Sequence, residues 1–327
     1  MINRQRQILA ALADGEFHSG QRLAESAGIT RSAVWKQIKR LTGLGLEVEG
    51  VTGRGYRLSS PLEMLDREHI RNLLDFSSGS VPVNIEVLFE TGSTNQYLLD
   101  AQAGGSVHGR AVLAEYQFAG RGRGENRWVS APASGLCLSL GWHYDSVPGS
   151  LTSLSLATGV ILAEVLQEAG CRDVRLKWPN DVVVNGAKLA GILIESRAQG
   201  GGPCDIVIGI GINVHLPVSL EHVINRQVTD LNRLLAPAVP SRNVLAAHLL
   251  NKLVNMLSEY DSDSFDSFRE KWRMLDYTAG KNAILLQSGQ QSSGRVVGID
   301  ENGLLIMSIK GKTRKFSSGE LNLRLLE

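Results

Sequence analysis

Apolar residues near the start of the chain repeat at helical spacing in three short stretches. The first stretch ends at Asp14-Gly15; Ser19 is placed to cap the second stretch, and Gly28 closes it. Thr30 is placed to cap the third, from Arg31 to Leu41, which leaves its basic residues on the outer face. The pattern predicts three helices, the last two joined as a helix-turn-helix.

Two alternating strands follow around Thr52-Gly53-Arg54-Gly55, which predicts a hairpin with a basic tip. Three helices and a hairpin predict a winged helix-turn-helix over residues 1–60. This region has nine Lys and Arg against five Asp and Glu, whereas the remainder of the chain is net acidic. Basic charge on the third helix and the hairpin favours DNA, and the alternative is a protein-binding winged helix with a solvated basic face. The predicted DNA-binding residues are Gln21, Arg22, Arg31, Ser32, Lys36 and Arg54.

Beyond a linker at Ser59-Ser60-Pro61, Leu62 to Leu74 predicts a helix, and buried strands then alternate with helices. Asn185-Gly186 predicts a two-residue hairpin turn, and Trp178-Pro179-Asn180-Asp181 predicts a bulge or turn, because proline cannot pair regularly in a sheet. The predicted strands cover residues 83–89, 111–117, 135–140, 175–184, 187–195 and 206–214, and helices begin at Gln96 and Ser150.

The C-terminal part changes from helices to short strands. Ser241 to Tyr260 and Phe265 to Leu275 predict helices, and short alternating strands from Thr278 onward predict a small β-barrel. We therefore expect an α+β protein with domains at 1–60, 61–276 and 277–327.

Composition excludes several classes of protein. Hydrophobic residues at 43% and charged residues at 20% are typical of a soluble globular protein. The apolar run from Leu151 to Gly170 contains Glu164, Gln167 and Glu168, which predicts a buried helix rather than a membrane span. The first six residues are not followed by the apolar h-region of a signal peptide, so we expect none. The three cysteines have neither metal spacing nor a disulfide pattern. We expect a cytoplasmic protein with no membrane partner.

The run Ala119-Gly120-Arg121-Gly122-Arg123-Gly124 lies between two predicted strands. Its glycines allow a close approach of backbone to ligand, and guanidinium groups bind carboxylate or phosphate oxygens in pairs. It lacks the Gly-Lys-Ser/Thr of a phosphate-binding P-loop and the following helix of a dinucleotide site. The run alone predicts an anion site or, equally, a flexible charged hairpin loop.

Other polar residues interrupt apolar strands. Ser93, Thr94 and Asn95 lie at a predicted helix N-terminus, where they either bind a ligand or simply cap the helix. Lys177 and Lys188 lie on strands beside Asn180 and Asp181, and a partly desolvated ammonium group favours an anion nearby.

Five motifs in order carry a resemblance to a known family. They are Gly-Ser-Thr-Asn at 92–95, Glu-Tyr-Gln followed by Ala-Gly-Arg-Gly-Arg at 115–123, Lys-Trp-Pro-Asn-Asp at 177–181, Lys-Leu-Ala-Gly-Ile-Leu at 188–193 and Gly-Ile-Gly-Ile-Asn at 209–213. Together they resemble the biotin protein ligases. With the winged helix, essentially the whole chain is similar to the bifunctional biotin ligase and biotin-operon repressor family.

The resemblance implies a central mixed-sheet α/β catalytic domain like those of biotin and lipoate ligases, and an SH3-like C-terminal barrel. It implies ATP and Mg²⁺ as cofactors, activation of biotin to biotinyl-5′-adenylate, and transfer to a lysine of a biotin carboxyl carrier protein. Operator DNA and a homodimer of the adenylate-bound protein are the other implied partners.

The resemblance also implies roles for individual residues, which fall into three groups. Arg121, Arg123 and Lys188 are the implied catalytic residues. Biotin is implied to contact Ser93, Thr94, Asn95, Gln117, Gly120, Arg121, Gly122, Arg123 and Lys188. The nucleotide is implied to contact Arg121, Arg123, Lys177, Asn180, Asp181 and Asn213, with Asp181 also the metal ligand.

Two features depart from the family pattern. Gly124-Glu125-Asn126 follow the second arginine where relatives commonly carry more basic charge, and no aromatic residue between Pro217 and Pro240 offers a stacking partner for adenine. The alternatives are a biotin-sensing transcription factor without transfer activity and a lipoate ligase on the same architecture. The arginines and Lys188 argue against the first, and the winged helix and Lys-Trp-Pro-Asn-Asp argue against the second.

Overall fold

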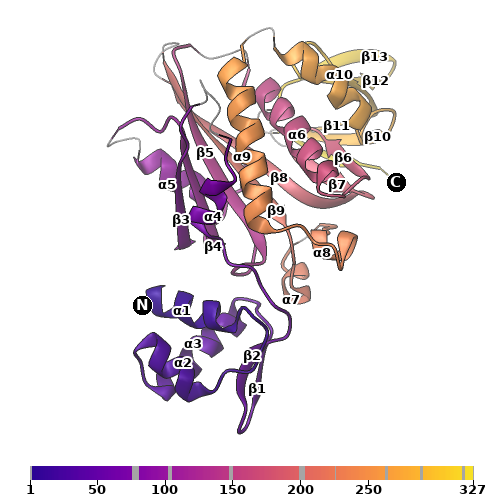
Figure 1. Cartoon of the computed structure of the whole chain (residues 1–327). Coiled ribbons are helices and arrows are strands. Elements are labelled where there is room, and N and C mark those ends of the chain that lie inside the picture. Colours follow the sequence, from indigo (N-terminus) through magenta and orange to yellow (C-terminus); the bar gives the residue numbers. More distant parts are fainter. Residues whose placement is uncertain are drawn as a thin grey trace.

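The N-terminal part of the computed structural model is a winged helix-turn-helix, as predicted. The structure describes residues 2–75, 81–101, 105–146, 150–198, 203–224, 226–261, 264–287, 290–318 and 321–326. Helices α1 (Ile2–Leu12), α2 (Gly20–Ala27) and α3 (Arg31–Gly43) precede the hairpin of β1 (Val48–Val51) and β2 (Gly55–Leu58) (Figure 1).

The predicted caps of these helices are present. The Ser19 hydroxyl accepts a hydrogen bond from the Arg22 amide at 3.1 Å, and the Thr30 hydroxyl accepts one from the Ala33 amide at 3.2 Å. Gly28 ends α2 in the left-handed conformation, with φ of 61°. Because Tyr56 and His18 exchange backbone hydrogen bonds of 2.8 and 2.9 Å, the hairpin is held against the turn before α2.

The central part is a seven-stranded mixed sheet of strand order β3-β4-β5-β9-β8-β7-β6. Strands β3 and β4 are parallel, and the other pairs are antiparallel. The strands are β3 (Asn84–Thr91), β4 (Arg110–Gln117), β5 (Gly135–Tyr144), β6 (Val174–Lys177), β7 (Asp181–Val184), β8 (Ala187–Ala198) and β9 (Cys204–Asn213).

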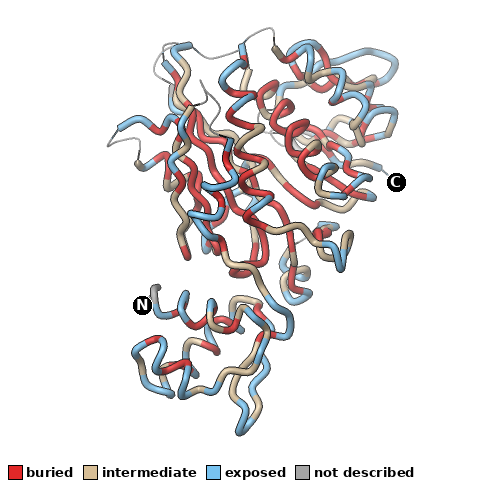
Figure 2. Tube along the Cα trace, viewed as in Figure 1, coloured by how far each residue is buried: buried red, intermediate tan, exposed pale blue. Residues whose placement is uncertain are grey.

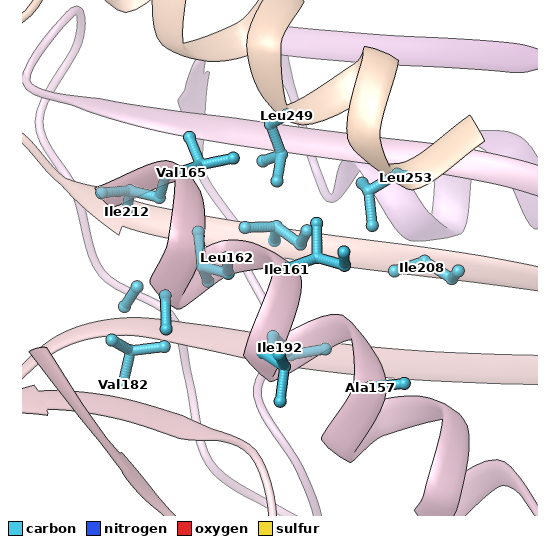
Figure 3. Close-up of a cluster of buried hydrophobic side chains, with 14 of the residues drawn as sticks. Ala157, Ile161, Leu162, Val165, Val182, Ile192, Ile208, Ile212, Leu249 and Leu253 are labelled. Atoms are coloured by element: carbon cyan, nitrogen blue, oxygen red, sulfur yellow. The ribbon is translucent and has the colours of Figure 1, made fainter. Parts of the chain in front are cut away.

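One face of this sheet is covered by α6 (Leu151–Glu168) and α9 (Arg242–Glu259), which form the main core with it (Figure 1). Ile161, Leu162 and Val165 of α6 meet Ile208 and Ile212 of β9 in this core (Figure 3). Helix α6 is long and apolar enough to cross a membrane, but 67% of it is buried inside the protein, so it is a core helix as expected (Figure 2).

The opposite face of the sheet carries α5 (Thr94–Ala101), which packs Leu98 and Leu99 against Val112 and Val207. Even-numbered residues of β9 enter the main core, whereas Val207, Gly209, Gly211 and Asn213 lie on the α5 face. This face is only partly covered, so it has room for a site.

The remaining helices and strands follow the large sheet in the sequence. Short helices α7 (Val218–Glu221) and α8 (Leu231–Leu235) precede α9, and α10 (Phe265–Leu275) packs on α6 through Phe265 and Trp272. A five-stranded antiparallel sheet then has the order β13-β12-β11-β10-β14. Its strands are β10 (Asn282–Gln287), β11 (Gln290–Ile299), β12 (Leu305–Ile309), β13 (Lys312–Phe316) and β14 (Leu321–Leu325).

One expectation needs correction, and two are met in part. The predicted helix over Leu62 to Leu74 reduces to α4 (Arg67–Asn72), because Leu62 and Leu65 donate backbone hydrogen bonds to Ala13 and Glu115 and hold the preceding segment extended. The predicted strand over 175–184 is two strands joined by the turn at 178–180. Among the described residues the C-terminal strands pair as an open sheet, since β13 and β14 are at opposite edges.

Candidate functional site

Three glycines on neighbouring strands form the floor of a cleft on the α5 face. A Cβ atom on Gly209 would clash with Asn95 Oδ1, and one on Gly211 would lie 2.5 Å from the Trp128 ring. A Cβ atom on Gly191 would lie 2.9 Å from Lys188 Nζ. The glycines therefore allow Asn95, Trp128 and Lys188 to lie flat on the sheet.

The N-terminus of α5 forms one wall. Gln117 Oε1 accepts hydrogen bonds from the Thr94 amide at 2.7 Å and the Thr94 hydroxyl at 3.1 Å. The Ser139 hydroxyl, on β5, lies 2.7 Å from Thr94 Oγ1 and 2.6 Å from Asn95 Oδ1. Ser93, Thr94, Asn95 and Gln117 are all buried, so this wall is a preformed polar network.

The Gly/Arg loop (residues 119–127) forms the second wall as a tight turn. The Gly122 amide donates to the Asn126 carbonyl at 2.7 Å, and the Asn126 side chain donates to the Arg123 carbonyl at 2.7 Å. Gly124 at the tip has φ of 62°, which a glycine adopts without strain. Gly120 packs under the Trp128 carbonyl, where a Cβ atom would lie 2.5 Å away. The loop is thus an internally hydrogen-bonded turn with Gly124-Glu125-Asn126 at its tip.

Cations gather around one carboxylate at the far end of the cleft. Lys188 on β8 forms an ion pair with Asp181 on β7, and the Asn185-Gly186 turn brings the two strands together with φ of 50° and 82°. Arg226 Nη1 lies 3.9 Å from Asp181 Oδ2, and Lys188 Nζ lies 5.7 Å from the centre of the Trp128 ring. Arg121 instead pairs with Glu195 on β8 at 2.7 Å.

The pKa directions describe the same cluster. Burial lowers the pKa of the Lys177 ammonium, and Arg226, Lys188 and Lys281 lower it further against the opposing effect of Asp181. Burial also lowers the pKa of the Arg123 guanidinium, again opposed by Asp181. The cleft therefore holds positive charge that is partly desolvated, which favours an anionic ligand.

The cleft has a volume of about 1390 Å³, above the roughly 300–1000 Å³ of a site for one small molecule. It extends from Ser93 at the α5 end to Leu323 and Arg324 of β14 at the other. A cleft of this volume is larger than one small ligand requires.

The predicted residues Asn95, Asn180 and Asn213 line the cleft, and their side-chain amides donate hydrogen bonds to backbone carbonyls. Asn95 Nδ2 donates to the Leu193 carbonyl at 3.0 Å and to Glu195 at 2.9 Å. Asn180 Nδ2 donates to the Ile192 carbonyl at 2.7 Å, and Asn213 Nδ2 donates to the Thr229 carbonyl at 3.0 Å. These amides tie separate segments of the cleft wall together.

Sequence reasoning missed four residues of the cleft region. Trp128 and Arg226 line it, and Ser139 and Cys137 lie beneath Thr94 and Gln117 on the α5 face of β5. Burial raises the pKa of the Cys137 thiol to about 11, so this cysteine is not a nucleophile at neutral pH. The position of Trp128, four residues after Gly124, could have predicted that it lines the cleft, because an aromatic residue after a glycine-rich loop can cover a ligand.

In the winged helix the predicted DNA-binding residues are all exposed. They are Gln21 and Arg22 on α2, Arg31, Ser32 and Lys36 on α3, and Arg54 at the hairpin tip. The Arg54 guanidinium lies 4.0 Å from the centre of the Phe17 ring, which supports the hairpin tip. Trp35 on α3 was not predicted, although it is 52% exposed with Lys39 Nζ 5.3 Å from its ring centre.

The cation-lined cleft on a mixed sheet and the winged helix point to a bifunctional class, a ligase with a helix-turn-helix module, and comparison with known proteins agrees. The biotin/lipoate A/B protein ligase family matches residues 90–213, and an HTH domain matches residues 4–57. The bifunctional ligase/repressor BirA of Salmonella typhimurium (strain LT2) is 39% identical over 320 residues, which are 98% of this chain and 97% of that protein. BirA of Escherichia coli (strain K12) is 37% identical over 98% of this chain and 97% of that protein. The chain belongs to the family of bifunctional ligase/repressor BirA proteins.

A solved structure agrees with this assignment. The biotin protein ligase from Aquifex aeolicus in complex with biotin and ATP superposes with a TM-score of 0.63 at 25% identity. The match covers 74% of this chain and 99% of that chain.

Proposed function

We propose that this protein activates biotin with ATP to biotinyl-5′-adenylate, transfers the biotinyl group to a lysine of a biotin carboxyl carrier protein, and represses biotin biosynthesis through its winged helix. Membership of the bifunctional ligase/repressor family supports both activities. The single observation that carries the ligase assignment is the cleft in which Lys188, Arg123 and Lys177 surround one carboxylate beside a preformed polar wall.

In the first step a biotin carboxylate oxygen attacks the α-phosphorus of ATP. The bond from that phosphorus to the bridging oxygen breaks, and pyrophosphate leaves with its electron pair. Two anions must be brought together, so fixed positive charge is the main requirement. We assign Lys188 to the carboxylate and α-phosphate, where it stabilises the developing charge, and Arg121 and Arg123 to the adenylate that the Gly/Arg loop encloses.

In the second step the neutral amine of the acceptor lysine attacks the carbonyl carbon of the mixed anhydride. AMP leaves, and the lysine nitrogen releases a proton to solvent as the amide forms. No protein nucleophile is required. Cys137 is buried and has a raised pKa, which agrees with an intermediate that is held rather than covalently attached.

We place the biotin ring against Ser93, Thr94 and Gln117, because these buried groups form a rigid set of donors and acceptors. Gly120 and Gly122 let the loop backbone approach it. Asn95 supports this wall through its bonds to Leu193 and Glu195. Trp128 lies on Gly211 between the two ends of the cleft and offers an apolar surface to the ligand.

On the nucleotide side we assign Lys177 to phosphate, and Asn180 and Asn213 to the support of the wall. Asp181 is the one carboxylate of the cation cluster, and Mg²⁺ binds one or two protein carboxylates together with substrate phosphates. Among the described residues no group of three or more metal-ligating side chains occurs, so the residues fit an ion held mainly by phosphate oxygens with Asp181 as its protein ligand. Such an ion would neutralise phosphate charge.

We further infer domains at 1–60, 61–276 and 277–327, with the C-terminal sheet forming an SH3-like barrel. The carrier protein, operator DNA and a second copy of the chain in the adenylate-bound state are the inferred partners, in the cytoplasm. The basic, exposed residues Arg31, Lys36 and Arg54 support DNA as one partner.

Transfer of labelled biotin to a purified carboxyl carrier domain, with ATP and Mg²⁺, tests the ligase. We expect transfer by the parent protein and a loss of about 10²-fold or more in Lys188→Ala, because one preorganised charge at the reacting oxygen supplies this much. Biotin binding without transfer by the parent would instead favour a biotin-sensing transcription factor, and transfer of lipoate but not biotin would favour a lipoate ligase.

A further inference from the structure

Arg226 belongs to a short segment that is fixed against the start of β8. The Lys188 amide donates to the Gln227 carbonyl at 3.0 Å, and the Thr229 amide donates to the Lys188 carbonyl at 2.9 Å. Arg226 therefore directly precedes Gln227, whose carbonyl is bonded to the Lys188 amide. The main chain at Arg226 is therefore positioned by the same strand that carries Lys188.

The side chain of Arg226 connects two walls of the cleft. Its Nη2 donates a hydrogen bond to Asn126 Oδ1 at the tip of the Gly/Arg loop, at 3.1 Å. Its Nη1 lies 3.9 Å from Asp181 Oδ2. Asn126 and Arg226 are far apart in sequence and belong to different elements, so the tertiary fold alone brings them together. The guanidinium remains 39% exposed, and its remaining N–H groups are accessible from the cleft.

The charge around Asp181 is not balanced within the cleft. Asp181 pairs with Lys188 and Arg226 and also stabilises the charges of Lys177 and Arg123. The described residues that line the cleft include seven Lys and Arg side chains, whereas Glu125 and Asp181 are the acidic ones. The loop tip contributes Glu125 and no basic residue between Arg123 and Arg127. On the wall that faces the loop tip, Arg226 supplies the positive charge.

We propose that Arg226 is a phosphate-binding residue of the nucleotide site, and that Asn126 holds its guanidinium in position. This inference rests on the proposed ligase function and extends it to a residue outside the five sequence motifs. A phosphate oxygen replaces the weak contact with Asp181, and the planar guanidinium offers paired N–H donors to it.

Biotin-dependent exchange of labelled pyrophosphate into ATP measures the first step. We expect Arg226→Ala to raise the KM for ATP about tenfold or more and to leave the KM for biotin within about twofold, because a hydrogen bond to a charged group corresponds to at least tenfold in affinity. Arg226→Lys keeps the charge without the fork and recovers part of the loss. Asn126→Ala keeps the Arg226 guanidinium but removes the hydrogen bond that holds it, so we expect the KM for ATP to rise about threefold.

Arg314→Ala is the matched control, because Arg314 is exposed on β13, at the opposite edge of the C-terminal sheet from β14, which lines the cleft. The release rate of labelled biotinyl-adenylate from each variant identifies the phosphate. Faster release together with a raised KM for ATP indicates the α-phosphate, and a raised KM alone indicates the β- and γ-phosphates.

An unchanged KM for ATP and unchanged release in Arg226→Ala would overturn the proposal. So would an equal rise in both KM values with no recovery in Arg226→Lys, since that result describes a structural residue. Absence of exchange by the parent protein would instead refute the ligase function itself, so the two failures are distinguishable.

Discussion

Asp181 organises the cations of the cleft before a ligand binds. It pairs with Lys188 and Arg226, and its charge opposes the pKa lowering that burial causes in Lys177 and Arg123. A carboxylate in this position keeps the ammonium and guanidinium groups protonated and directed inward. At the proposed nucleotide site we expect phosphate oxygens to take over these partners.

Lys177 gives the site a pH dependence. Its pKa is lowered from the usual 10.5, first by burial and then by neighbouring cations. Below that lowered pKa the ammonium is charged and attracts phosphate. As pH rises through it the charge is lost, so the KM for ATP in pyrophosphate exchange should rise at alkaline pH, earlier than an ordinary lysine would titrate. Lys177→Arg should remove this rise because arginine stays protonated. The same alkaline profile in both proteins would rule out Lys177 as the titrating group.

Helix α3 combines exposed residues that we expect to contact DNA with a contact to the catalytic sheet. Arg40, in its last turn, pairs with Glu90 at the end of β3 at 3.2 Å, two residues before the Gly-Ser-Thr-Asn motif. Its N-terminal residues Arg31, Ser32 and Lys36 remain exposed. The helix therefore presents its first turns outward, as a recognition helix does in the major groove.

Two substitutions should separate sequence reading from backbone binding. Arg31→Ala should weaken binding to the preferred DNA by about 1–3 kcal/mol and relax its sequence preference. Arg54→Ala, at the hairpin tip, should weaken binding to all sequences alike and lower the salt slope by about one. Fluorescence anisotropy on DNA selected by the protein from a random pool, and on a scrambled duplex, at several salt concentrations measures both. Equal effects on the two duplexes in Arg31→Ala would contradict a base contact.

The winged helix and the catalytic sheet share a packed junction. Phe89 of β3 and Ala133, which follows the Gly/Arg loop, belong to the hydrophobic cluster of the winged helix. Arg242 on α9 and Glu115 on β4 form a buried ion pair in the catalytic domain. The Leu65 amide donates a hydrogen bond to Glu115 at 2.6 Å, and Arg242 donates one to the Gly135 carbonyl at 2.8 Å. This pair ties the connecting segment to both strands that flank the Gly/Arg loop.

Breaking that pair should destabilise the protein. Arg242→Met leaves the Glu115 carboxylate buried without its cation, and we expect the free energy of unfolding to fall by about 3–5 kcal/mol. The double variant Glu115→Gln/Arg242→Met removes the buried charge and should be closer to the parent. Urea denaturation followed by circular dichroism measures the three proteins. A double variant less stable than Arg242→Met would show that the charge is not the cause.

Local sequence signals predicted most of the helices and strands and several of the segments that line the cleft. Caps such as Ser19, Thr30 and Ser150, and the Asn185-Gly186 turn, act over a few residues, so their effect is readable from neighbours in the chain. The ordered motifs predicted the α5 wall, the Gly/Arg loop and the Lys188 strand for the same reason. The helix over Leu62 to Leu74 was wrong because long-range bonds to Ala13 and Glu115 outweigh helical propensity there.

Only the tertiary structure decided how those parts form one cleft. Gly191 and Gly211 lie beneath Trp128, and Arg226 meets Asn126, because paired strands and a folded loop bring residues from distant segments within contact distance. The pairing of Asp181 with Lys188, and the pKa shifts around it, likewise depend on burial that no local pattern reports. The sequence by itself determined which chemical groups the protein has and which elements carry them. Packing of those elements decided which groups meet, since burial and distance set the strength of every charge interaction in the site.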